Sequence, residues 1–103
     1  MSDKRLIVTN DGSHTLYIPE LNETYHSMHG AIRESRHVFI EMGLFYFLER
    51  ERAKEASILE IGFGTGLNAL LCALFAKSNN VSVRYESLEA FPLLAEEVSN
   101  LNY

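Results

Sequence analysis

The chain places its apolar residues in several short runs, and four of these runs predict β-strands. Arg5–Thr9 and Thr15–Ile18 are β-prone, and the Asp-Gly pair between them is a strong signal for a β-hairpin. Ile58–Leu59 is a short aliphatic run followed closely by a glycine, which is typical of a buried strand. Val81–Leu88 alternates and is rich in β-branched residues, so it predicts a further strand.

Other apolar positions recur at helical spacing. Gly30–His37 is expected to form a short helix and Val38–Glu55 a longer one, in which Gly43 marks a weak point, a bend or a packing contact. Leu67–Ala76 is rich in Ala and Leu and free of Gly and Pro, so it predicts a helix. After the last predicted strand, Phe91–Tyr103 is expected to form one helix.

The turn between the buried strand and the following helix holds Gly62, Gly64 and Gly66. Glycine lets the backbone take positive φ and leaves no Cβ in the way of a ligand, while the helix offers unpaired N–H groups and the positive end of its dipole. The third glycine comes one residue too early for a dinucleotide-binding loop, and a phosphate P-loop would need a Gly-Lys-Ser/Thr ending. A glycine-rich turn without a ligand is the alternative.

Two acidic residues flank this turn. Glu60 precedes the glycines, and Glu89 follows the next predicted strand, about twenty residues beyond them. A carboxylate there suits the adjacent hydroxyls of a ribose, because it has two acceptor oxygens. Glu86 competes for this role but lies within the strand, whereas such sites form at the carboxyl ends of strands. The alternative for Glu89 is a solvated loop acid.

The composition narrows the class of protein. A chain of 103 residues with 47% hydrophobic residues and a net charge of -5 predicts one soluble globular domain. Neither a membrane-spanning run nor a signal peptide is present, so we expect a cytoplasmic protein with no membrane partner. Cys72 is the only cysteine and is expected to be a buried apolar residue. His26 and His29 lie three apart but lack a convincing third ligand, so we predict no metal site.

The acidic residue, spacer and G-x-G-x-G pattern of Glu60–Gly66 resemble motif I of class I S-adenosylmethionine-dependent methyltransferases. The segments Tyr25–Leu44, Glu60–Asn68 and Ser87–Pro92 are similar to the bacterial tRNA 5-methylaminomethyl-2-thiouridine methyltransferases, which occur alone or as half of a bifunctional enzyme. The resemblance implies S-adenosylmethionine as cofactor, a Rossmann-like β-α-β core, and methylation of the aminomethyl nitrogen on the wobble uridine of tRNA.

The resemblance also implies the residues of a cofactor site. Glu60 would face the amino-acid end of the cofactor, and Glu89 its ribose. Tyr25 would approach from the N-terminal extension, with packing at the domain edge as the alternative. No catalytic residue is assigned, because the catalytic acid of this family follows a fourth strand, beyond Tyr103. The expected cofactor-binding residues are Glu60, Gly62, Gly64, Thr65, Gly66, Asn68, Glu89 and Tyr25.

The expected fold class is α/β, a partial class I methyltransferase fold with an N-terminal β-hairpin and helical extension. The extension would span residues 1–56 and the cofactor-binding half 57–103. A complete doubly wound sheet has about seven strands and needs about two hundred residues, so the chain is interpreted as the first half of such a domain. The strand Ser57–Ile61 would then have a bare edge, which predicts a homodimer unless the hairpin covers it.

Other functions agree with the same pattern. The chain would equally suit a methyltransferase that acts on a small molecule or a protein, or a non-catalytic module that associates with itself. The net charge of -5 does not predict a phosphate-binding surface, so any surface for tRNA is expected mostly outside this chain.

Overall fold

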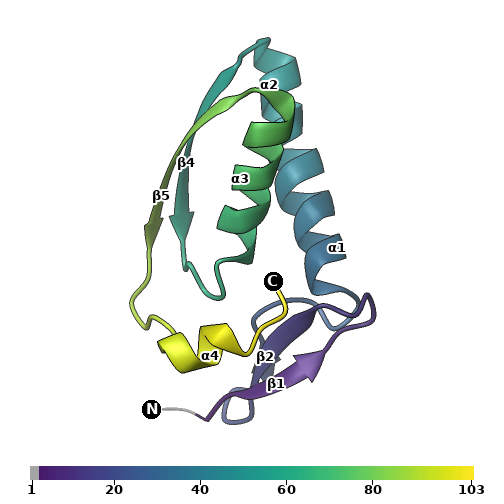
Figure 1. The fold of residues 1–103 in the computed structure, drawn as a ribbon, viewed down its shortest axis with the longest axis vertical. Coiled ribbons are helices and arrows are strands. Elements are labelled where there is room, and N and C mark those ends of the chain that lie inside the picture. The colour runs from purple at the N-terminus through teal and green to yellow at the C-terminus, as the bar shows by residue number, and fades with distance from the viewer. Residues whose placement is uncertain (1–2) are drawn as a thin grey trace.

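The computed structural model describes residues 3–103 and contains two sheets with helices packed against one of them (Figure 1). Three antiparallel strands, in the order β1-β2-β3, form the first sheet. Two parallel strands, β4 and β5, form the second and are joined by the helix α3. The α/β class is therefore confirmed. The bounds are β1 (Arg5–Val8), β2 (His14–Ile18), β3 (Glu23–Thr24), β4 (Glu55–Ile61), α3 (Leu67–Asn79) and β5 (Ser82–Leu88).

The predicted hairpin is confirmed. β1 and β2 pair antiparallel, with Arg5 opposite Tyr17 and Val8 opposite His14. The short β3 adds a third strand along β2, where the Tyr25 N–H also donates to the Leu16 carbonyl at 2.9 Å. The residue pattern of β3 does not predict a strand, because two residues are too few to show an alternation.

The two helices expected over 30–37 and 38–55 form one continuous helical segment. Arg36, at their junction, has helical dihedral angles (φ −63°, ψ −44°), so there is no break. The helix ends earlier than predicted: Arg52 is left-handed at φ 52°, and Glu55 already begins β4. The predicted extension to Glu55 was therefore wrong. The segment consists of α1 (Ala31–Ser35), the π-helical η1 (Arg36–Phe45) and α2 (Tyr46–Glu51).

The N-terminus of this long helix is capped by the hairpin turn. Its own N-cap residue is Gly30, which has no side chain to offer. Instead, three hairpin side chains accept hydrogen bonds from the first three helical N–H groups, which otherwise have no intrahelical partner. The donor–acceptor pairs are Ala31–Thr9 (3.1 Å), Ile32–Ser13 (3.1 Å) and Arg33–Asp11 (2.8 Å). The contacts lock the hairpin against the helix.

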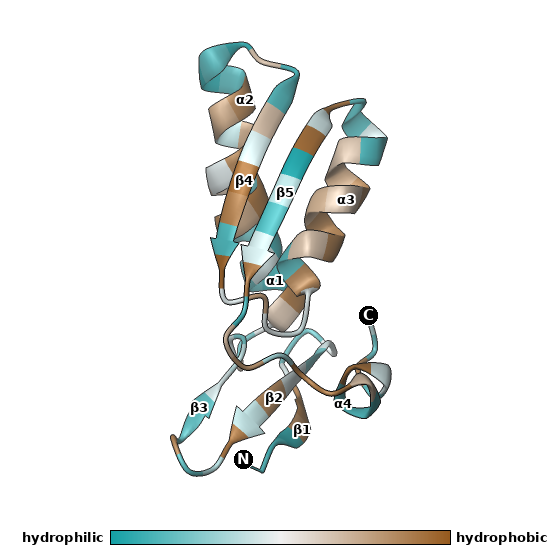
Figure 2. Cartoon of the chain, turned by 90° about the vertical axis from the view of Figure 1, so that its left-hand side faces the viewer, coloured by the Kyte–Doolittle hydropathy of each residue, from teal (hydrophilic) through white to brown (hydrophobic). Residues whose placement is uncertain are grey.

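The long helix and α3 cover one face of the β4–β5 pair, and the core lies between them (Figure 1). Cys72 is buried there, as predicted. The opposite face, toward the viewer in Figure 2, leaves Leu59, Ile61 and Leu88 61–74% exposed. Among residues 3–103, no helix combines the length and apolar character needed to span a membrane. The core consists of Ala31, Ile40, Leu44, Leu48, Ala56, Leu67, Leu71 and Cys72.

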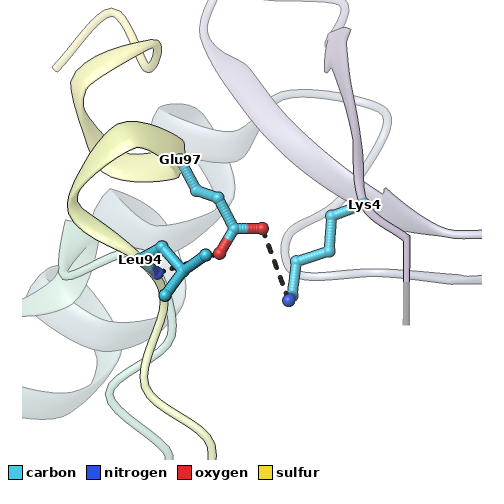
Figure 3. Close-up of polar contacts among 3 residues, drawn as sticks. All are labelled: Lys4, Leu94 and Glu97. Carbon is cyan, nitrogen blue, oxygen red and sulfur yellow. Dashed lines mark hydrogen bonds and ion pairs between the residues drawn. The ribbon is translucent and has the colours of Figure 1, made fainter. Parts of the chain in front are cut away.

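The segment after β5 crosses to the N-terminal sheet. The single helix expected over 91–103 was wrong, because only α4 (Ala95–Ser99) is helical. Lys4 pairs with Glu97 at 3.4 Å, and the Glu97 carboxylate also accepts the Leu94 N–H at the start of α4 (Figure 3). Asn102 then bridges the hairpin turn, donating to the Gly12 carbonyl and accepting the His14 N–H, each at 2.9 Å.

Candidate functional site

The turn between β4 and α3 has the backbone shape that its glycines predict. Gly62, Gly64 and Gly66 have φ of +90°, +58° and +83°, in the left-handed region that other residues rarely adopt. Their surroundings differ. A Cβ added to Gly66 would lie 2.9 Å from the Phe63 ring, whereas one added to Gly62 would have no other heavy atom within 4 Å. Gly66 therefore serves local packing, and Gly62 is the open position.

Glu89 lies against this turn. One of its carboxylate oxygens accepts the Gly64 N–H at 2.7 Å, and the other accepts the Phe91 N–H at 3.1 Å. The hydrogen bond from Gly64, followed by that from Phe91, lowers the pKa of Glu89 below its usual value. The competing Glu86 is on the open face of the sheet, 3.1 Å from the Arg84 guanidinium. The structure thus brings Glu89, and not Glu86, to the glycine turn.

The side chains of Glu60, which precedes the turn, and Asn68, which follows it, contact each other. Glu60 accepts a hydrogen bond from the Ser87 hydroxyl at 3.0 Å and a longer one from the Asn68 amide at 3.5 Å. The Asn68 side-chain oxygen is buried and has no donor among residues 3–103. A buried acceptor without a donor is costly, so this atom is available to an N–H or ammonium group of a ligand.

Thr65 and Tyr25 contact the turn from inside the protein. The Thr65 side chain is buried, and its hydroxyl lies 2.9 Å from both His26 Nε2 and the Tyr103 hydroxyl. The Tyr25 ring packs on Gly64, where an added Cβ would be 3.2 Å away. Sequence reasoning missed His26 and Tyr103 as neighbours of the glycine turn, because no local pattern links them to Thr65.

The expected cofactor residues therefore lie on or around one turn, where the Glu89 carboxylate bonds to Gly64 and the Glu60 carboxylate to Asn68 at the start of α3. No group of three His, Cys, Asp or Glu side chains suited to a metal ion occurs within residues 3–103. The fold and this cluster define the class: an α/β protein with a glycine-rich strand-to-helix turn and an acidic side chain at the end of the next parallel strand.

Comparison with known proteins gives the family. No family profile matches the chain. Its relatives include proteins named tRNA 5-methylaminomethyl-2-thiouridine biosynthesis bifunctional protein MnmC. That from Leptospira interrogans is 33% identical over 84 residues, 78% of this chain and 13% of the relative. That from Pseudomonas aeruginosa is 38% identical over 82 residues, 74% of this chain and 12% of the relative.

A solved structure points to the same family as these relatives. The crystal structure of MnmC2 from Aquifex aeolicus matches 91% of this chain and 32% of its own, with a TM-score of 0.75 and 35% sequence identity. The chain belongs to the MnmC family, which confirms the resemblance inferred from the motifs, and it corresponds to the N-terminal portion of these proteins. It spans about one eighth of the length of the curated relatives it matches.

Proposed function

We propose that this chain is the cofactor-binding portion of an S-adenosylmethionine-dependent methyltransferase with a Rossmann-like fold. In the complete protein it would methylate the aminomethyl nitrogen on the wobble uridine of tRNA. The observation that carries the proposal is the turn in which Gly62, Gly64 and Gly66 all have positive φ and the Gly64 N–H donates to the Glu89 carboxylate. The names of the relatives, which concern a modified uridine of tRNA, support the substrate class.

The residues of the turn fit this cofactor. The open space at Gly62 admits a ligand close to the backbone. Glu60 and the donorless Asn68 oxygen are acceptors suited to the α-ammonium of an amino-acid tail. Each Glu89 oxygen accepts one backbone N–H and keeps further acceptor capacity for ribose hydroxyls. When bound, S-adenosylmethionine supplies an electrophilic methyl group on sulfonium sulfur.

Isothermal titration calorimetry of the chain with S-adenosylmethionine and with NAD tests the proposal. We expect binding of S-adenosylmethionine and little or none of NAD, because the third glycine stands one residue too early for a pyrophosphate loop. A strict preference for NAD would end the methyltransferase interpretation.

Two glutamate variants sharpen this measurement. Glu89→Ala is expected to weaken S-adenosylmethionine binding about tenfold, since it removes charged acceptors for the ribose and the bond that fixes Gly64. Glu86→Ala is the matched control, because its carboxylate lies on the open face beside Arg84. Equal losses in both variants would show that Glu89 has no special role.

We also propose a homodimer through β4, whose outer edge has no strand partner among residues 3–103. Identical edges pair with two-fold symmetry, and unpaired edges favour such pairing. An antiparallel pair centred on Ile58 would set Glu60 opposite Ala56 and Glu55 opposite Ile61, so no two carboxylates would be directly opposed. The cavity beside Ile58 is lined mostly by apolar side chains, including Phe39 and Phe47 of the flanking helix.

Disulfide trapping tests this dimer. In a Cys72→Ala background, Ile58→Cys is expected to cross-link under oxidation, because only the residue on the two-fold axis faces its own copy. Glu86→Cys, on the neighbouring strand, is the control and should remain monomeric on a denaturing gel. Light scattering that shows only monomer at the highest attainable concentration would refute the dimer.

A further inference from the structure

The Thr65 hydroxyl joins three segments that lie far apart in the sequence. It belongs to the glycine turn, His26 follows β3, and Tyr103 ends the chain. Both neighbours are 2.9 Å from the Thr65 oxygen, and Thr65 as a whole is only 6% exposed. A buried junction of this kind restricts the one non-glycine residue between Gly64 and Gly66.

His26 is itself anchored to the N-terminal sheet. Its backbone N–H donates to the hydroxyl of Thr15, a fully buried residue of β2, at 2.9 Å. Its carbonyl accepts the Thr24 hydroxyl at 2.7 Å. The backbone of His26 is thus tied to β2 and β3, while its ring reaches the glycine turn. The His26 ring therefore links the N-terminal sheet to the glycine turn by a hydrogen bond, beside the packing of the Tyr25 ring on Gly64.

The direction of the hydrogen bonds depends on the charge of His26. Tyr103 donates to Thr65, so the single Thr65 proton is free to donate to a neutral His26 Nε2. A protonated ring would be a donor instead, and the buried Thr65 proton would lose its acceptor. Burial lowers the pKa of His26, while the carboxylates of Glu34, from α1, and Glu60, from β4, oppose this effect.

We propose that neutral His26 is a positioning residue, which holds Thr65 and with it the glycine turn in the shape that binds S-adenosylmethionine. This inference rests on the proposed function for the identity of the ligand. It adds a residue outside the turn, drawn from a different sheet, on which the affinity of the site depends. His26 acts through Thr65, and protonation of its ring loosens the turn.

One test is the affinity for S-adenosylmethionine, measured by calorimetry at about pH 8 and about pH 4.5. The lower value lies well below the ordinary titration of histidine, because burial lowers the pKa of His26. Both proteins are compared by the fall in affinity between the two pH values. The fall is expected to be about fivefold larger in the wild type than in His26→Gln, because protonation costs the wild type one hydrogen bond. The glutamine accepts from Thr65 at any pH, so its profile contains only the titration of the ligand and of other groups. A matching fall in both proteins would overturn the proposal.

Variants of Thr65 separate the hydroxyl from the shape of the side chain. Thr65→Val keeps the shape, removes the hydroxyl, and is expected to bind weakly at both pH values. Thr65→Ser keeps the hydroxyl and is expected to recover most of the affinity and the dependence on His26. Circular dichroism is the check that each variant folds. Wild-type affinity in the folded Thr65→Val protein would also overturn the proposal.

Amide hydrogen exchange of Gly64 and Gly66 tests the positioning role without any ligand. Protection factors at these two amides are expected to fall with protonation of His26 in the wild type and to stay level in His26→Gln. Equal protection in both proteins at both pH values would contradict the role of His26. If S-adenosylmethionine binds to none of the proteins while the exchange result holds, the proposed function fails and the positioning role of His26 stands.

Discussion

Replacing Gly62 by alanine is expected to weaken S-adenosylmethionine binding by about tenfold to a hundredfold while the protein still folds. An alanine at φ +90° strains the backbone by about 1–2 kcal/mol, but its Cβ would meet no protein atom within 4 Å. The methyl group would instead project into the open space through which the cofactor is proposed to approach. Overpacking by one methyl group typically costs about 1–3 kcal/mol, which sets the size of the expected loss.

Gly12→Ala is a closely matched control. Gly12 lies in the hairpin turn at φ +84°, and a Cβ there would also meet nothing within 4 Å. Both variants therefore carry similar backbone strain, and thermal unfolding should show similar losses of stability. Calorimetry should show a loss of affinity in the Gly62 variant alone. Wild-type affinity in both variants would place the cofactor elsewhere, and an equal loss of affinity in both would assign the effect to stability.

Replacing Asp11 by alanine is expected to lower the free energy of unfolding by about 2–3 kcal/mol, a large share of the stability of a small domain. Asp11 accepts a hydrogen bond from the Arg33 N–H at the start of the long helix. It also accepts from the hydroxyls of Thr9 and Ser13 and from the Ser13 N–H. Alanine would leave the helix N-terminus without this acceptor and would free the hairpin turn.

Urea denaturation measures this loss, and Asp3→Ala is the control. Asp3 is the only other aspartate, and it is exposed near the start of the chain. Its removal changes the net charge equally and is expected to change stability by less than about 0.5 kcal/mol. If both variants lose stability alike, the effect comes from net charge and not from capping.

The hydrogen bonds of Asp11 also predict that the stability of the protein depends on pH in the acid range. Burial raises the pKa of Asp11, but the hydrogen bonds from Ser13, Arg33 and Thr9 outweigh it and hold the pKa well below the usual 3.8. Because the folded pKa is the lower one, the unfolded chain binds the proton first as pH falls. The contribution of Asp11 is therefore complete above about pH 4 and is lost below it. Asp11→Ala should show a flatter stability profile in that range.

The residue pattern was sufficient to predict those elements whose conformation depends on their own side chains. The β4–glycine–α3–β5 unit follows from an aliphatic run, three spaced glycines and an alternating run, and the structure has these elements within a few residues of the predicted bounds. The approach of Glu89 to the glycine turn also follows from the pattern, because the carboxyl ends of neighbouring parallel strands meet at one edge.

The pattern failed where an element depends on distant partners. The break expected between the two helices does not exist, because the helix is capped by the hairpin at its start and both α1 and η1, on the two sides of the junction, pack against α3. The helix expected over 91–103 is mostly absent, because Asn102 and Tyr103 bond to Gly12, His14 and Thr65 instead of continuing a helical ladder. Tertiary contacts outweighed local propensity at both places.

The sequence by itself determined the α/β class, the hairpin, the glycine turn and the acid that faces it, since each rests on residues with local conformational preferences or on the register of adjacent strands. Only the tertiary structure decided that Asp11 caps a helix twenty-two residues away in the chain. It also decided that His26 and Tyr103 meet at Thr65. Hydrogen bonds between distant side chains depend on how whole elements pack, and no spacing along the chain records that packing.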